Sequence, residues 1–269
     1  MNAREVSHIY AVVASYNIPK QHFAAVYRAL FANAIEAKIP MTVVASVTSH
    51  SDQNLLLAVY EEFGCPQAIE IVVQFQKGDG KRSALAMALR AIARRCPDNK
   101  TLTIMLDGDI VLEPRALSRC LPFFRADPEL AALTTNNDAV VPAGGLAADW
   151  YALRHAQRHL LMSSLSLSGR LLVLTGRFSI YRTADTICPE FIRILECDRI
   201  QHWRLGSIKF LSGDDKSSWF YLLRQHRKML YVPDVKAYGI EALPPGTSFA
   251  SGTSKLMFRW FGNMIRTNG

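Results

Sequence analysis

The sequence has no long hydrophobic run and no low-complexity tract or internal repeat in its 269 residues. Apolar runs such as residues 10–14 are far shorter than the roughly 20 residues that a membrane-spanning helix needs. The N-terminus also lacks the continuous apolar segment of a signal peptide. These absences predict a chain that is soluble or bound peripherally to a membrane.

Cysteine is scarce, and no two cysteines have the C-x-x-C spacing of a metal or redox motif. The five cysteines are Cys65, Cys96, Cys120, Cys188 and Cys197. An odd number without paired spacing argues against a disulfide framework and a zinc site. We expect free thiols in a reducing compartment, mostly as small buried hydrophobic side chains.

Basic residues exceed acidic ones, 31 to 23, which gives a net charge of +8. From Trp203 onwards, the basic residues are interleaved with aromatic residues. Such a surface suits an acidic ligand, an anionic membrane or nucleic acid, while a merely solubilising surface is the plainer alternative. No nucleic-acid-binding motif accompanies the charge, so a nucleic-acid partner is not expected.

Apolar strand-like runs alternate with amphipathic helical patterns, which is typical of an α/β fold. Strands are predicted at residues 8–15, 41–47, 68–74, 102–107, 129–135 and 229–235, with a further short strand in 175–182. Helices are predicted from Pro19, from Ser51 or Asp52 to about Phe63, at 84–93, after Pro114, and at 149–165, 183–197, 214–224 and 248–269. The first four strands should form parallel β-α-β units with right-handed crossovers.

Polar loops follow three of these strands. They are Tyr16-Asn17, the basic loop 76–83 with Lys81 and Arg82, and Asp107-Gly108-Asp109. Because the carboxyl ends of parallel strands meet at one edge of a sheet, these loops should converge on one cleft.

Each of these loops has a functional and a plainer interpretation. Asp107 and Asp109 can hold Mg²⁺ or Mn²⁺ against a diphosphate, or simply form a turn and a helix cap. The loop with Lys81 can bind an anion at a helix N-terminus, or be a flexible basic loop. It lacks the spacing of a Walker loop.

Two features lie further along the chain. Asp214 and Asp215 begin a helix; one can stabilise the helix N-terminus and leave the other free to act. The last segment places Arg259 and Trp260 among large apolar residues. That segment can lie at a membrane interface or pack across the cleft. The abrupt end suggests a fragment of a longer protein.

With these motifs identified, the chain resembles the processive family 2 glycosyltransferases, which include cellulose and hyaluronan synthases. The matching segments are Ser15-Tyr16-Asn17, residues 80–85, Asp107-Gly108-Asp109, Gly213-Asp214-Asp215 and residues 256–260. The glutamine of the family's Q-x-x-R-W motif is Leu256 here, which leaves any hydrogen bond of that glutamine to another residue.

The resemblance implies a GT-A type nucleotide-diphospho-sugar transferase fold, with a mostly parallel central sheet flanked by helices. One domain would cover residues 1–269, with a nucleotide-binding half at about 1–135, an acceptor and catalytic half at about 136–247, and an interfacial helix at about 248–269. Family members carry flanking transmembrane helices, which this chain lacks. We therefore expect a catalytic domain at the cytoplasmic face of the inner membrane, within an envelope polymerisation and export complex.

The resemblance also implies roles for individual residues. Asp107 and Asp109 would hold Mg²⁺ or Mn²⁺, and Asp215, with Asp214 beside it, would supply the catalytic base. The nucleotide-sugar would contact Ser15, Tyr16, Asn17, Lys81, Arg82, Asp107 and Gly108. The acceptor or the diphosphate would contact Arg177, Arg259 and Trp260.

Within the family, residues 168–179, 212–219, 229–234 and 259–266 resemble the alginate-polymerising branch. That likeness implies GDP-mannuronate as donor and a growing anionic β-1,4-linked polysaccharide as acceptor. Many relatives carry Asp-Asp after the second strand, where this chain has Ala45-Ser-Val-Thr48, which is compatible with a guanine nucleotide. A polymer synthase with a UDP-sugar donor, and a catalytically silent nucleotide-binding subunit, remain the alternatives.

Overall fold

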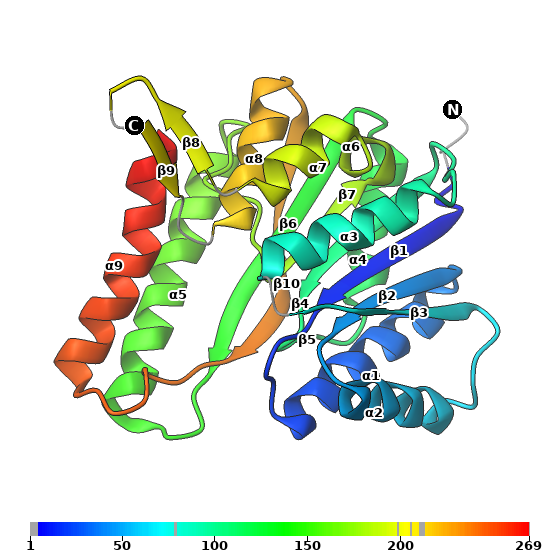
Figure 1. The fold of residues 1–269 in the computed structure, drawn as a ribbon, viewed down its shortest axis with the longest axis horizontal. Helices are drawn as coiled ribbons and strands as arrows, with labels where there is room; N and C mark the ends of the chain where they lie inside the picture. Colours follow the sequence, from blue (N-terminus) through cyan, green and yellow to red (C-terminus); the bar gives the residue numbers. More distant parts are fainter. Residues whose placement is uncertain (1–4, 78–79, 198, 205, 210–212, 269) are drawn as a thin grey trace.

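A computed structural model describes residues 5–77, 80–197, 199–204, 206–209 and 213–268. Helices cover both faces of an eight-stranded sheet (Figure 1). The sheet contains β1 (His8–Ala14), β2 (Met41–Val47), β3 (Ile69–Phe75), β4 (Thr101–Asp107), β5 (Ile110–Leu112), β6 (Leu130–Val140), β7 (Phe178–Arg182) and β10 (Lys228–Ile240). The helices are α1 (Lys20–Ala37), α2 (His50–Glu62), α3 (Lys81–Ala93), α4 (Ala116–Ala126), α5 (Gly145–Ser166), α6 (Thr183–Thr186), α7 (Pro189–Glu196), α8 (Asp214–Arg224) and α9 (Phe249–Asn268).

The N-terminal half confirms the predicted parallel β-α-β units. Its strands lie in the order β3-β2-β1-β4, and each neighbouring pair is parallel. The predicted cap of α2 was wrong, because the cap is Ser49 and not Ser51 or Asp52. Ser49 has extended backbone angles, and its Oγ accepts a hydrogen bond from the Asp52 backbone N–H at 3.1 Å. The third helix of the pattern, α3, starts at Lys81, three residues earlier than predicted.

The C-terminal half completes the sheet in the order β4-β7-β6-β10-β5, in which β7 and β5 are antiparallel to their neighbours. Strand β5 was not predicted. The expected helix after Pro114 does form, but Ile110 and Leu112 are buried and β5 first pairs with β10. Three apolar residues are too short a pattern to identify an edge strand, because the pairing partner lies more than a hundred residues away.

The helix predicted over residues 183–197 is broken into α6 and α7. The break falls at Pro189, which begins α7, and Cys188 before it has extended backbone angles. A residue preceding proline is disfavoured in the helical conformation, which explains the interruption. A small antiparallel pair, β8 (Arg199–His202) with β9 (Gly206–Lys209), was also not predicted. Residues 78–79 of the basic loop and 210–212 before α8 lie outside the described residues.

The five cysteines are not joined in disulfides, as predicted, but most are not buried. Cys120 is buried, while Cys65, Cys96 and Cys197 are exposed. Cys65 and Cys96 have positive φ angles just after helices α2 and α3, and Cys197 caps α7. Helix ends lie at the surface, so the expectation of buried thiols was wrong for these three.

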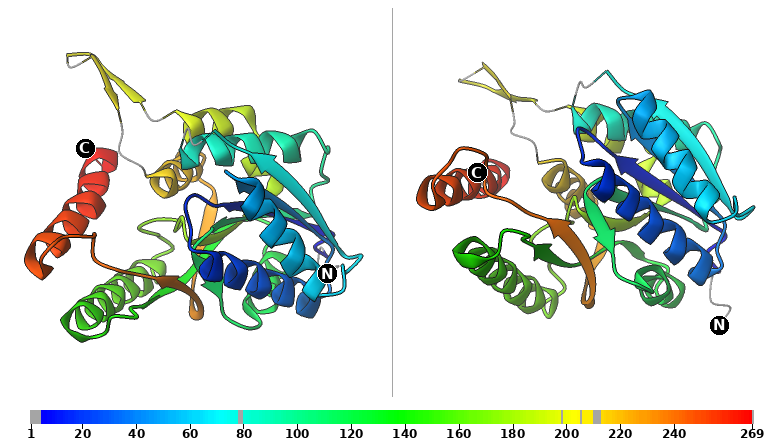
Figure 2. Two further views of the ribbon diagram at one scale, coloured as in Figure 1. Left: turned by 60° about the horizontal axis from the view of Figure 1, so that its bottom comes forward. Right: turned by 90° about the horizontal axis from the view of Figure 1, so that it is seen from below.

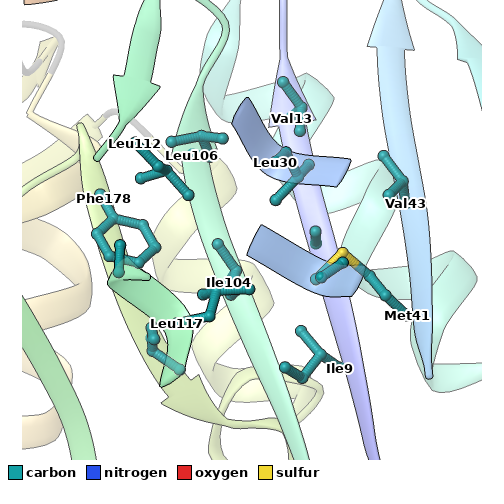
Figure 3. Packing of buried hydrophobic residues seen from close by; sticks show 14 of the residues in the cluster. Ile9, Val13, Leu30, Met41, Val43, Ile104, Leu106, Leu112, Leu117 and Phe178 are labelled. Carbon is teal, nitrogen blue, oxygen red and sulfur yellow. The ribbon is translucent and has the colours of Figure 1, made fainter. Parts of the chain in front are cut away.

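Two hydrophobic clusters, one on each face of the sheet, form the core. The first packs the sheet against α1, α2 and α4, and Figure 3 shows part of it, with Val13 and Leu106 on the strands and Leu30 on α1. The second packs the opposite face against α3, α7 and α8. Burial on both faces accounts for the nearly continuous apolar character of the central strands.

Helices α5 and α9 lie side by side at one end of the molecule, away from α1 and α2 (Figures 1 and 2). The indole rings of Trp150 and Trp260 are stacked, with centroids 5.7 Å apart and planes inclined by 13°. Within the described residues, no helix is both long and apolar enough to cross a membrane.

Candidate active site

A cavity of about 1110 Å³ opens between the carboxyl ends of the strands and the α5–α9 pair. Its lining comes from the β4–β5 turn, the start of α3, the 175–177 turn, the start of α8, and one side each of α5 and α9. Segments from both halves of the chain therefore enclose one space, as predicted for open α/β sheets. The volume is at the upper end of the range for small-molecule sites.

The β4–β5 turn presents Asp107 and Asp109 to this cavity. Gly108 between them approaches the end of β1 so closely that its backbone N–H donates to the Ala14 carbonyl at 3.1 Å. A Cβ at Gly108 would lie 2.4 Å from Ser15 Oγ and 2.9 Å from the Ala14 oxygen. Only glycine fits there without displacing the end of the first strand. This steric requirement explains why the middle residue of the Asp-Gly-Asp motif is glycine.

Lys81, the first residue of α3, connects the two acidic segments of the site. Its Nζ lies 2.6 Å from Asp107 Oδ1 and 2.7 Å from Asp214 Oδ2. Burial disfavours the ammonium, but the two carboxylates outweigh burial and raise the pKa of Lys81. Gly176 packs against this pair, since a Cβ there would lie 3.0 Å from Nζ. Lys81 therefore joins the end of β4 to the start of α8 by ion pairs.

Asp214 and Asp215 occupy the first turn of α8, after the N-cap residue Gly213. Asp214 is buried and ion-paired with Lys81, whereas Asp215 lines the cavity without an ion pair among the described residues. Burial first, and then the charge of Asp214, raise the pKa of Asp215. Both acids line the cavity, but Asp214 is held by Lys81 and Asp215 has no ion pair within the described residues.

The acidic cluster, as we define it, consists of Asp107, Asp109, Asp214 and Asp215. No group of three or more His, Cys, Asp or Glu side chains placed to hold a metal exists in the described part of the chain. Mg²⁺ and Mn²⁺ at nucleotide sites, however, commonly take one or two carboxylates and complete their shell with phosphates and water. Asp107 and exposed Asp109 supply oxygen ligands of that kind, and Lys81 balances only part of the cluster's charge. The donor set fits a divalent cation.

Arg82 and Arg177 line the cavity but are held by protein groups. Arg82 donates from Nη1 to the Leu195 carbonyl at 2.8 Å and from Nη2 to Ser217 Oγ at 3.0 Å, which ties α3 to α7 and α8. Arg177 forms an ion pair with Glu241. A donor or acceptor contact by either guanidinium stays a prediction, and each would compete with these bonds.

Ser15, Tyr16 and Asn17 lie at the carboxyl end of β1, beside the Asp107–Asp109 turn, but do not line the cavity itself. Ser15 is buried, whereas Tyr16 is 68% exposed and Asn17 has a positive φ of 51° that turns the chain. Gln76 Nε2 donates to the Ser15 carbonyl at 3.1 Å and joins this turn to the loop after β3. The predicted convergence on one cavity is therefore confirmed for the loops of Lys81 and of Asp107–Asp109, and it was wrong for the Tyr16 turn, which lies beside them without lining the cavity.

Arg259 and Trp260 reach the cavity from α9. The resemblance implies that Trp260 contacts the acceptor or the diphosphate, but one face of its ring is covered by Trp150. Only the remaining ring surface is left for a sugar. The described residues provide no ion-pair partner for Arg259.

The sequence interpretation overlooked the cavity side of α5. Arg154, His155 and Arg158 line the cavity there, and Glu241 was missed as the partner of Arg177. We define the basic cluster as Arg154, Arg158 and Arg259. Burial first, and then the charge of Arg177, lower the pKa of Arg158 to about 10; burial, Arg177 and Arg158 lower that of His155 to about 4. The available signal was the four-residue spacing of Arg154 and Arg158, which places both on one helix face.

Comparison with known proteins agrees with this geometry. Residues 7–263 match the family described as glycosyltransferase like family 2. The chain is 39% identical over 267 residues to the glycosyltransferase alg8 of Pseudomonas syringae pv. tomato, covering 99% of this chain and 54% of that protein. It is also 39% identical over 263 residues to the glycosyltransferase alg8 of Azotobacter vinelandii, covering 97% and 53%. The chain thus spans about half the length of these relatives.

Solved structures share the fold at low sequence identity. The mannosyltransferase PcManGT of Pyrobaculum calidifontis, in complex with GDP-Man and Mn²⁺, has a TM-score of 0.60 at 16% identity, covering 96% of this chain and 64% of that one. The glucosyl-3-phosphoglycerate synthase of Mycobacterium tuberculosis, with Mn²⁺, UDP-glucose and phosphoglyceric acid, has a TM-score of 0.52 at 11% identity, covering 96% and 80%. The predicted GT-A type fold is confirmed, and the chain belongs to the family 2 glycosyltransferases.

Proposed function

We propose that this domain transfers a sugar from a nucleoside diphosphate to a growing polysaccharide, with inversion at the anomeric carbon. The observation that carries the proposal is the placement of two acidic pairs around Lys81 in one cavity, with Asp109 and Asp215 free of ion pairs in the described structure. One pair suits the leaving diphosphate and the other suits the attacking hydroxyl. The membership of the chain in family 2 supports the reaction class.

Asp215 is the base in this proposal. Its carboxylate takes the proton of the acceptor hydroxyl as that oxygen attacks the anomeric carbon, while the diphosphate leaves on the opposite side. The raised pKa makes Asp215 a stronger base than an ordinary aspartate. Lys81 holds Asp214 next to it and so keeps the start of α8 against the Asp107 turn.

Asp107 and Asp109 would hold the divalent cation. When bound, Mg²⁺ or Mn²⁺ neutralises charge on the departing diphosphate. The solved structures with Mn²⁺ support this assignment by fold likeness. Arg259 would add a guanidinium to the same diphosphate through paired hydrogen bonds.

The donor we propose is GDP-mannuronate, and the product is the β-1,4-linked mannuronate chain of alginate. The relatives named alg8 support this choice, and so does the guanine nucleotide bound by the fold neighbour PcManGT. The absence of Asp-Asp after β2 is compatible with a guanine base. A net charge of +8 suits an anionic polymer.

We propose further that the domain lies on the cytoplasmic face of a membrane through the outer side of α5. Leu146, Leu153, Leu160 and Leu167 follow each other at seven-residue intervals and are 63%, 69%, 71% and 91% exposed. Seven residues are nearly two helical turns, so these leucines form one apolar stripe suited to a lipid surface. Co-sedimentation with anionic vesicles should be lost in the double variant Leu153→Ser/Leu160→Ser. Equal sedimentation of wild type and variant would exclude this face.

The nucleotide preference is the sharpest test of the proposed reaction. Calorimetry should detect GDP binding to this chain in the presence of Mn²⁺, with much weaker binding of UDP. Asp109→Ala should remove most of the Mn²⁺ dependence, because a cation ligand is lost. Preferential binding of UDP would exclude the GDP-sugar donor, and identical GDP affinity with and without Mn²⁺ would exclude the metal site.

A further inference from the structure

The basic cluster is the part of the cavity that the proposed chemistry leaves incompletely used. Arg154 and Arg158 are one turn apart on α5, and both side chains line the cavity. Neither forms an ion pair with a carboxylate of the described residues. By contrast, Arg177 pairs with Glu241, and Arg90 pairs with Glu196.

Arg154 is held in place by uncharged groups. Its guanidinium donates to Gln157 Oε1 and lies 5.9 Å from the ring centre of Trp260 and 5.2 Å from that of Phe261. Aromatic rings position a guanidinium without neutralising it, and the charge stays available for an anion. The arrangement also fixes Arg154 at the junction of α5 and α9.

Arg158 lies deeper in the same cavity, and its neighbours are mostly cationic. Burial and Arg177 lower its pKa, and Asp215 opposes that shift, so Arg158 is close enough to the proposed base to feel its charge. Lys216, the residue after Asp215, donates from Nζ to the Leu172 carbonyl at 3.1 Å and forms no ion pair with a carboxylate of the described residues. His155 contributes no charge near neutral pH, because its pKa is lowered to about 4.

A half-buried guanidinium without an ion pair is unfavourable, because the charge of Asp215 offsets only part of the cost of desolvating Arg158. A ligand that brings an anion to this position would remove the cost. The anion must lie within reach of Arg158, in the part of the cavity near Asp215. A sugar carboxylate next to the attacking hydroxyl meets that requirement, and its two oxygens match the two parallel N–H groups of a guanidinium.

We propose that Arg158, with Arg154 one turn away, forms a subsite for the carboxylate of a hexuronate, so that α5 distinguishes acidic sugars from neutral ones. The inference rests on the proposed function and deepens it. A neutral sugar of the same shape would leave the guanidinium unpaired. Binding sites discriminate strongly against an analogue that leaves one of their buried polar groups without a partner. The same carboxylate chemistry is present in the last sugar of the growing chain and in the donor sugar, and we favour the chain because Arg158 is near Asp215.

Calorimetry on the 269-residue chain with four probes tests the subsite. The probes are a mannuronate hexasaccharide, the neutral β-1,4-mannose hexasaccharide of equal length, GDP-mannuronate with Mn²⁺, and GDP with Mn²⁺. The variants are Arg158→Gln, which removes the charge, and Arg158→Lys, which keeps it without the paired N–H geometry. Arg193→Gln is the matched control, because Arg193 is an exposed arginine on α7 that does not line the cavity.

We expect the wild type to bind the mannuronate hexasaccharide at least about tenfold more tightly than the neutral one. Arg158→Gln should abolish that preference, Arg158→Lys should retain part of it, and Arg193→Gln should retain all of it. GDP affinity should be the same in every variant. If Arg158→Gln instead weakens GDP-mannuronate and not the hexasaccharide, the carboxylate subsite stands and belongs to the donor sugar.

Three results would overturn the subsite. In the first, the wild type binds both hexasaccharides equally or binds neither. In the second, Arg158→Gln and Arg193→Gln lose the same affinity for the mannuronate hexasaccharide. In the third, Arg158→Gln loses as much affinity for GDP as for the mannuronate hexasaccharide. The last result would assign Arg158 to the diphosphate. Failure of the proposed function is distinguishable, because it would appear as a preference for UDP over GDP in wild type. Circular dichroism of the variants, compared with wild type, identifies any loss of folding.

Discussion

The acidic cluster and the basic cluster line one cavity, yet they are built differently. The acidic residues stand at a strand end and in the first turn of α8, joined by Lys81, and Gly108 packs directly on the backbone of β1. The basic residues project from α5 and α9, two helices joined by an aromatic stack. The first cluster is fixed by the sheet, and the second by side-chain packing at its edge.

The difference assigns different work to the two sides of the cavity. Groups that act on the reacting atoms need fixed positions. A sheet edge provides them where the backbone is closely packed, as at Gly108 against β1. Groups that recognise a long, charged sugar chain can tolerate the small displacements that packed helices allow. Catalysis on the sheet side and recognition on the helix side is therefore the division that the following predictions test.

The largest effect is expected for Asp215→Asn. Transfer of mannuronate from GDP-mannuronate should fall by roughly 10²–10⁴-fold, since the amide cannot accept the proton. GDP affinity should stay within about twofold of wild type. Asp149→Asn, which neutralises an exposed aspartate on α5 outside the cavity, is the control and should keep its activity. Substantial transfer by Asp215→Asn would mean that the base lies elsewhere.

Lys81→Met should destabilise the acidic cluster next most strongly. The variant removes the positive charge that the four carboxylates of the acidic cluster surround. We expect the free energy of unfolding to fall by about 2 kcal/mol near pH 7. This is less than for a fully buried ion pair, because the Lys81 side chain is 32% exposed. The loss should shrink as the pH falls, because the raised pKa values of Asp107 and Asp215 allow protonation to relieve the repulsion. Urea unfolding from pH 7 to 5 measures both effects.

The control for that experiment is Lys100→Met, which removes an exposed lysine with no ion pair in the described structure. Equal stability of the two variants at pH 7 would show that the Lys81 ion pairs contribute nothing to folding.

The positive charges around His155, next to the basic cluster, should make the stability of the protein depend on pH. Its folded-state pKa of about 4 lies below the ordinary value of 6.5, so the unfolded chain takes up the proton first on acidification. The stability that the neutral ring contributes is complete above pH 6.5 and is lost as the pH falls toward 4. When the pH falls from 6.5 to about 4, the free energy of unfolding of His155→Gln should therefore decrease by about 1–2 kcal/mol less than that of the wild type. Parallel stability curves would contradict the lowered pKa.

The smallest effect is expected where the two helices meet. A double-mutant cycle with Trp150→Leu and Trp260→Leu should give a coupling energy of about 1 kcal/mol in the free energy of unfolding, the usual size for an aromatic pair. Additive losses would mean that the stack does not hold α9 against α5, and the basic cluster would then need another anchor.

The sequence alone predicted the elements that depend on local pattern. The strands of the first half are long, apolar and β-branched, so their periodicity identified them, and the parallel order followed from the helices between them. Asp107, Asp109 and Lys81 could be placed at one sheet edge for the same reason, because strand direction determines on which edge a loop lies. The residue pattern left open which of Asp214 and Asp215 is free to act, and the family resemblance pointed to Asp215.

Tertiary structure decided what depends on distant partners. Strand β5 exists because Ile110–Leu112 meets residues 237–239 of β10, and Lys81 bridges Asp107 to Asp214 across more than a hundred residues of chain. Which arginines find a carboxylate is likewise a matter of long-range geometry: Arg177 meets Glu241, while Arg158 does not meet one in the described structure. Helical spacing could put Arg154 and Arg158 on one face of α5, but only the packing of α5 on β6 and β10 and beside α9 turned that face toward the cavity.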